Sequence, residues 1–307
     1  MNYKNKFDFV KYRNVFFAAS AAVTIIGAIM LLFFGLNYGV DFKAGTSLDI
    51  SLGKPTDRAQ AEQLFSQAEV APAVLTIGGG NNDRVSARFE DELSEEQVKK
   101  IMTIFTENFG SQVSSEVNTV SPDMANEMKN KAMIAVAIAS LAVGLYVTIR
   151  FDWRSALSAV LTILYDAFFV IAIFSIFRLE VTLPFVAAVL TIIGYSINDK
   201  IVILDRIREN MRFAKLKTSQ DVADLVNKSI WQTMGRSINT VLTVIFAAVC
   251  LLIFGSEAIK LFALAKLIGL VSGVYSSICL TTPFWFLLKR SSVQRAKLHT
   301  AKPKPQP

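Results

Sequence analysis

The chain has 307 residues, 52% of them hydrophobic, and a formal net charge of +7. Its mean hydropathy of +0.43 is too high for a soluble domain of this size. The single histidine, His299, lies outside the apolar stretches, which excludes a Ser-His-Asp triad or a histidine-based metal site within them. No Walker-type Gly-x-x-x-x-Gly-Lys-Ser/Thr motif is present. The sequence therefore predicts a non-enzymatic membrane protein without cofactor or metal.

Six apolar stretches are long enough to cross about 30 Å of hydrocarbon. The first follows a basic N-terminus, as a signal peptide would. However, it is longer than a typical signal-peptide core and no clean cleavage site follows it, so we expect a retained helix. The predicted spans are residues 15–36, 131–149, 157–177, 183–204, 238–254 and 261–288.

The charges are distributed as the positive-inside rule requires. Residues 37–130 carry fifteen acidic and eight basic side chains, a net charge of −7. The predicted loop 205–236 carries seven basic and four acidic side chains, and both ends of the chain are basic. This pattern predicts cytoplasmic termini and argues against nucleic acid as a partner. The predicted divisions are a cytoplasmic N-terminus with the first span (1–36), an extracytoplasmic domain (37–130), five further spans (131–288) and a basic cytoplasmic tail (289–307).

The pattern of residues 46–120 predicts a small α/β domain. This segment contains no cysteine, so disulfides do not stabilise the domain. Residues 46–52 alternate polar and apolar side chains, as a half-buried strand does. Ser94 with Gln97 forms a capping box that begins a helix. The predicted βαββαβ order is typical of a ferredoxin-like sandwich. We therefore expect an α-helical polytopic membrane protein with six transmembrane helices and a small α/β ferredoxin-like extracytoplasmic domain. Such a domain fits a stabilising ectodomain and a surface that handles a partner or an emerging chain equally well.

Asp199 lies in the fourth predicted span, within the run GYSINDK at 194–200. A carboxylate inside a membrane span is costly enough to indicate a function. Ser196, three residues earlier, shares its helical face, and Asn198 is a further polar neighbour. Asp199 can thus carry a proton. It also lies close enough to the basic segment to form a structural ion pair near the interface, and the residues alone leave both interpretations open.

Four other charged residues lie in or next to the predicted spans. Arg236 enters the fifth span from the same side as Asp199, and a guanidinium can hold a carboxylate in a fixed fork. Its alternative role is a cytoplasmic anchor. Asp166, in the middle of the third span, predicts a buried hydrogen bond between helices. Lys200 and Lys266 each require an acidic partner or a path along which the side chain can snorkel.

Several separated motifs, in this order, resemble those of the SecF-like members of the SecD/SecF family. That family belongs to the resistance-nodulation-division superfamily. The resemblance covers nearly the whole chain. The motifs lie at residues 36–46 after the first span, 194–206, 208–210, Arg236 and 269–278.

The resemblance implies a subunit that works with SecD beside the SecYEG channel, with SecA and a YajC-like accessory protein. It would use the proton-motive force to assist late steps in the export of unfolded preproteins. Its expected location is the bacterial cytoplasmic membrane, in contact with lipid. In this family the residues matching Asp199 and Arg236 are implicated in proton flow. One charge that moves across 100 mV releases about 2.3 kcal/mol, which can bias a domain motion.

Three positions depart from the family pattern. Ala44 stands where glycine is usual, so the turn there must avoid positive φ. Lys200 stands where threonine is usual, and Lys266 where an apolar residue is usual. Two rival functions remain. A small-molecule or lipid exporter of the same superfamily would need a roomier external domain, and in a non-transporting assembly subunit Asp199 and Arg236 would form a structural ion pair.

Overall fold

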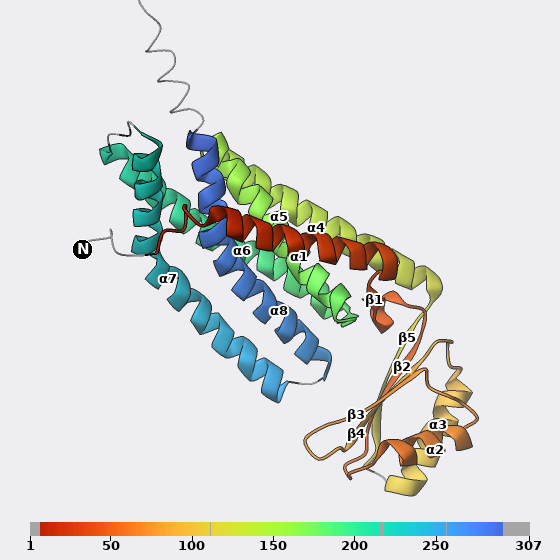
Figure 1. The fold of residues 1–307 in the computed structure, drawn as a ribbon. Helices are drawn as coiled ribbons and strands as arrows, with labels where there is room; N and C mark the ends of the chain where they lie inside the picture. Colours follow the sequence, from red (N-terminus) through yellow and green to blue (C-terminus); the bar gives the residue numbers. More distant parts are fainter. Residues whose placement is uncertain (1–6, 111, 215, 217, 256, 291–307) are drawn as a thin grey trace, which may run out of the picture.

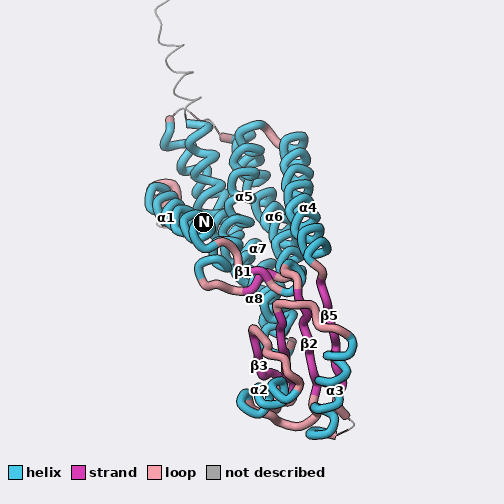
Figure 2. Tube along the Cα trace, turned by 90° about the vertical axis from the view of Figure 1, so that its right-hand side faces the viewer, coloured by secondary structure: helices cyan, strands magenta, loops and turns pink. Residues whose placement is uncertain are grey.

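A computed structural model describes residues 7–110, 112–214, 216, 218–255 and 257–290. The predicted cationic residues Lys4, Lys6, Lys215 and Lys217, and the basic tail from 291 onward with His299, lie outside these residues. A helical bundle carries a smaller α/β domain at one end (Figures 1 and 2). Within the described part, six helices are long and apolar enough to cross a membrane, which confirms the predicted class.

The helices of the bundle extend beyond the predicted apolar stretches. The segment 205–236, expected as a loop, is mostly a helical hairpin made by the end of α6 and the start of α7. Val226 and Ile230 of α7 join the same buried apolar cluster as Ile203 and Ile207 of α6, which stabilises this extension. The helices are α1 (Arg13–Phe34), α4 (Pro122–Arg150), α5 (Trp153–Ile176), α6 (Leu183–Phe213), α7 (Ser219–Phe254) and α8 (Glu257–Ser276), which continues through a π-helical segment, η3 (Ser277–Thr281).

The α/β domain has the predicted βαββαβ order. Its four strands form an antiparallel sheet in the order β3-β4-β2-β5, which is the ferredoxin-like arrangement, and both helices cover one face (Figure 1). Leu48 and Val85 of the sheet belong to one apolar core with Phe65 and Phe105 of the helices. The capping box at Ser94 is present. The elements are β2 (Gly45–Ser51), α2 (Arg58–Gln67), β3 (Val74–Gly78), β4 (Arg84–Phe89), α3 (Glu95–Phe109) and β5 (Ser114–Val120).

A short connection ties the α/β domain to the start of α6. Strand β1 (Asn37–Tyr38) pairs in parallel with β6 (Glu180–Val181), and the 3-10 turn η2 (Val40–Phe42) follows β1. A Cβ at Gly39 would lie 2.7 Å from the Glu180 carboxylate and 3.1 Å from the backbone oxygen of Val181, so glycine eases the close approach of β1 to β6. Oδ2 of Asp41 accepts a hydrogen bond from the backbone N–H of Leu183, at 2.7 Å.

A second link comes from strand β4. Arg88 forms an ion pair with Glu180 of β6. Burial lowers the pKa of Arg88, and the nearby Asp41 carboxylate acts in the opposite direction. Ala44 avoids positive φ as expected, and the next residue, Gly45, takes it instead at +135°. The domain is therefore joined to the bundle by polar contacts at the start of α6 as well as by the chain itself.

Candidate functional site

Helix α6 carries the predicted site residues about halfway along its length. Asp199 lies sixteen residues after Leu183, a rise of roughly 24 Å. A Cβ at Gly269 of α8 would lie 2.3 Å from Cδ1 of Ile192, so glycine lets α8 approach α6 closely. The small residues of the last span therefore pack within the bundle.

Asp166 and Lys200 form a buried ion pair between α5 and α6. Nζ of Lys200 lies 2.6 Å from Oδ2 of Asp166, and both side chains are fully buried. Lys200 also donates to Ser196 Oγ at 2.6 Å and to Ser276 Oγ at 2.9 Å. Ser272 donates to the other carboxylate oxygen at 2.9 Å, and Ser196 and Ser276 donate to Oδ2. We call these five residues the Asp166–Lys200 cluster. It satisfies both charges by hydrogen bonds within the protein, as buried ions require.

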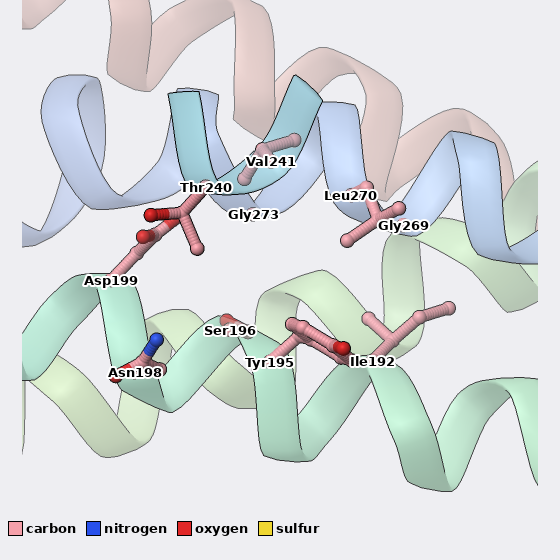
Figure 3. A pocket seen from close by; sticks show the side chains of 10 residues that line it. All are labelled: Ile192, Tyr195, Ser196, Asn198, Asp199, Thr240, Val241, Gly269, Leu270 and Gly273. Carbon is pink, nitrogen blue, oxygen red and sulfur yellow. The ribbon is translucent and has the colours of Figure 1, made fainter. Parts of the chain in front are cut away.

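Asp199 lies on a different side of α6, toward α7. Its side chain is only 6% exposed and lines a narrow cleft between α6, α7 and α8. Figure 3 shows its carboxylate pointing toward Thr240 of α7, with Gly273 of α8 nearby. The cleft has room for about one water molecule. Within the described ranges Asp199 forms no ion pair. A carboxylate so placed can bind and release a proton without first breaking a salt bridge.

The structure does not bring Arg236 to Asp199. The Arg236 side chain is exposed on α7 and forms no ion pair with any residue that the structure describes. Its backbone carbonyl accepts a hydrogen bond from Thr240 Oγ1 at 2.8 Å. Arg236 therefore lies one helical turn from the residue that Asp199 faces, but on the outer surface of this chain.

Asn198 and Lys266 lie at the edge of this region. Asn198 is exposed and lines the same cleft as Asp199. Nζ of Lys266 lies 5.8 Å from the ring centroids of both Tyr195 and Phe262. The Lys266 ammonium is thus stabilised by aromatic faces, not by the acidic partner expected from sequence.

The chain is similar to known proteins over nearly its whole length. The profile described as "Protein export membrane protein SecD/SecF, C-terminal" matches residues 97–291, and that described as "SecD/SecF GG Motif" matches residues 29–56. The protein translocase subunit SecF of Alicyclobacillus acidocaldarius is 40% identical over 95% of this chain and 96% of its own length. The chain belongs to the SecD/SecF family.

Longer proteins of the family are similar as well. The protein translocase subunit SecDF of Bacillus subtilis is 43% identical over 94% of this chain. The crystal structure of SecDF from Thermus thermophilus matches with a TM-score of 0.80 and 29% identity over 94% of this chain. The chain spans 39% of the length of each of these two proteins. The relatives in the SecD/SecF family are translocase subunits, a non-enzymatic role.

The family match to residues 29–56 includes the connection between the α/β domain and α6. Gly39 and Gly45 lie in it, and each is held where a side chain would collide with neighbouring atoms. These two glycines of the chain therefore have a packing role at this junction.

The sequence indicates that Asp166 and Lys200 are buried charges, but it does not indicate that they pair with each other. The expected helix–helix hydrogen bond of Asp166 is confirmed, with Ser272 and Ser276 as its donors from α8. In the sequence these serines are simply small residues of the last span, although their four-residue spacing places both hydroxyls on one face. Thr240 has no sequence signal that distinguishes it from other threonines of the spans.

Proposed function

We propose that this protein is the SecF subunit of a bacterial Sec translocase, in which proton movement through Asp199 assists the export of unfolded preproteins. A role as an accessory subunit of protein translocation follows from membership of the family. Its proposed partners are SecD and the SecYEG channel, with SecA and a YajC-like protein acting in the same pathway. Both termini are assigned to the cytoplasm because of the positive-inside pattern.

The contrast between the two buried carboxylates carries the proposal. Asp166 is neutralised by Lys200 at 2.6 Å and accepts hydrogen bonds from three serines. Asp199 has no such cation and lines a cleft with room for about one water. Of these two carboxylates in the core, Asp199 is therefore the one free to exchange a proton. Ion pathways in membrane proteins are commonly built on such residues.

Helix α6 offers a route from the proton site to the α/β domain. A proton on Asp199 would change how α6 packs against α7 across the cleft that Asp199 and Thr240 line. The start of the same helix, about 24 Å away, is bonded to Asp41 and lies next to the Arg88–Glu180 ion pair. A small displacement of α6 would thus reach the base of the domain. One charge that crosses 100 mV releases about 2.3 kcal/mol, which can bias such a motion.

Arg236 enters this proposal through the assembled complex. Its guanidinium is exposed on α7, one turn from Thr240, where a partner subunit or a rotation of α7 can bring it to the proton path. The resemblance to the family implicates it in proton flow. In this chain alone it does not neutralise Asp199, which keeps the carboxylate available.

The test is export of a secreted reporter in cells that carry Asp199→Asn. We expect the proton-dependent part of export to be lost, while the variant still co-purifies with SecD. Asp205→Asn is the matched control, because Asp205 lies on the same helix but is exposed. Normal export by Asp199→Asn would overturn the relay. Export by the double variant Asp199→Arg/Arg236→Asp would instead support a structural ion pair in a non-transporting subunit.

A further inference from the structure

A large apolar groove lies between α4, α5 and α6, next to the base of the α/β domain. Its volume is about 760 Å³, within the range of small-molecule sites. Met133 and Leu141 line it from α4 and are 64% and 73% exposed, so the groove opens sideways toward the bilayer. The other apolar walls include Leu164 and Ile171 of α5 and Phe185, Val186 and Val189 of α6.

The end of the groove nearest the domain is polar and positively charged. Asn126, Lys129 and Asn130 line it there, at the start of α4. Nζ of Lys129 lies 5.0 Å from the ring centroid of Tyr38, which holds the ammonium at this end. Lys129 forms no ion pair in the part of the chain that the structure describes, whereas Lys131 pairs with Glu127 at 2.7 Å. The groove thus presents one uncompensated cation and two amides beside an apolar channel.

The groove is closed at its other end, inside the bundle. Beyond Leu141, helix α4 packs onto α5. A Cβ at Gly144 would lie 3.6 Å from Val160, and Val147 is fully buried. From Asn126 to Leu141 the rise along α4 is roughly 22 Å. That length is about half the 40–45 Å thickness of a bilayer with its headgroups, so the groove is as long as one leaflet.

We propose that this groove binds one anionic phospholipid. Its phosphate would lie at Lys129 between Asn126 and Asn130, and an acyl chain would run along residues 133–141. The polar end of the groove matches a lipid headgroup, and the apolar channel matches an acyl chain. The length of the groove matches one leaflet. A transmembrane helix of another subunit spans both leaflets, and the closed inner end leaves it no path through the groove. Basic pockets between membrane helices bind anionic headgroups by the same charge complementarity.

The test measures lipid retained by the purified full-length chain. The protein in detergent is mixed with dioleoylphosphatidylglycerol or dioleoylphosphatidylcholine, and native mass spectrometry counts the bound lipids. We expect one retained phosphatidylglycerol in preference to phosphatidylcholine. Lys129→Gln should reduce this preference about fivefold, the contribution of one lysine near an anionic headgroup. Lys131→Gln, two residues away and already paired, should leave it unchanged.

A second pair of variants tests the acyl channel without altering charge. Ala137→Trp fills the groove and should abolish retention, whereas Ile138→Trp faces away from the groove and should preserve it. Equal retention of the two lipids, or retention by Ala137→Trp equal to that of Ile138→Trp, overturns the proposal. Cross-linking of Ala137→Cys to SecD in membranes would also overturn it, by assigning the groove to a subunit interface.

Discussion

The two regions of this molecule place their polar groups in opposite ways. In the α/β domain, Leu48, Phe65 and Phe105 fill the centre and most charged side chains lie at the surface. In the bundle, Asp166 and Lys200 lie at the centre, while outward-facing residues such as Leu32 are apolar. Water surrounds the domain and drives its apolar burial, whereas lipid is as apolar as leucine and provides no such force. The bundle therefore depends on hydrogen bonds and on close packing at small residues.

Two neighbouring charged residues of α6, Asp199 and Lys200, differ in what surrounds them. Lys200 points to α5 and α8 and is committed to the Asp166–Lys200 cluster. Asp199, the residue before it, faces α7 across a cleft. The ion pair and its hydrogen bonds thus hold α5, α6 and α8 together. The contact between α6 and α7 is the one that protonation of Asp199 can change.

The largest expected effect is on the Asp166–Lys200 cluster. Lys200→Met leaves Asp166 buried without its cation, and we expect a loss of about 3–5 kcal/mol of stability. Thermal unfolding of the purified chain in detergent, followed by tryptophan fluorescence, measures it. The double variant Asp166→Asn/Lys200→Met removes both charges and should recover most of the loss. If the single and double variants unfold at the same temperature, the loss does not come from an uncompensated charge on Asp166.

A smaller effect on stability distinguishes an apolar side chain in the core of the domain from one that faces lipid. Ile50→Val removes one methylene from the fully buried core of the domain and should cost about 1 kcal/mol. The same change at Ile138, which is 61% exposed on α4, should have almost no effect because lipid fills the space. Hydrogen exchange of the β2 and α4 amides in the full chain reports each region separately. Equal losses at both positions would contradict the comparison.

The smallest effect is pH-dependent and confined to the surface of the domain. Nζ of Lys100 donates to Oε2 of Glu69 at 2.8 Å, which lowers the pKa of Glu69 below its usual value. The ion pair therefore stabilises the domain above the unfolded-state pKa, and this contribution is lost as the pH falls through the folded-state value. Because both side chains are well exposed, the contribution is slight.

The measurement compares Glu69→Gln with the parent chain by hydrogen exchange of the domain. We expect a slight destabilisation near pH 7 and none at a pH below the folded-state pKa of Glu69, where the carboxyl is protonated in both states. Glu116→Gln is the control, since Glu116 is exposed on β5 and forms no ion pair within the described residues. An identical response of the two variants would show that Lys100 does not act on Glu69.

The domain was predictable from sequence because its signals are local. The alternation of residues 46–52 and the capping box at Ser94 each specify an element without reference to distant residues. The six spans were predictable for the same reason, since length and apolar content define them. The full helix lengths were not, because the ends of α6 and α7 are stabilised by packing against each other.

Which residues pair with the buried charges could not be predicted from sequence. The pairing depends on how the helices cross, and the spacing of residues along one helix does not specify that crossing. Entry from the same membrane side suggested Arg236 as the partner of Asp199, yet Arg236 lies on the outer surface. Lys200 finds Asp166 because α5, α6 and α8 pack together at this level, which also brings Ser276 Oγ of α8 to 2.9 Å from the ammonium. A four-residue spacing identifies which side chains share a face, but only the assembled bundle determines what that face contacts.

The π-helical segment η3 acts as a phase shift within α8. In a regular α-helix, Ser276 and Thr281 would point about 140° apart, since each residue turns 100°. The π turn returns the chain to the same face after five residues, and Thr281 Oγ1 donates to the Ser276 carbonyl at 3.1 Å. Thr281 thereby reaches Thr162 of α5 at 2.8 Å, and Trp285 donates to Ser155 at 3.1 Å. Deleting one residue here would turn the π turn into a regular α turn and keep Trp285 on α5, whereas straightening the π turn at full length would rotate everything after it by about 100° and turn Trp285 away from Ser155.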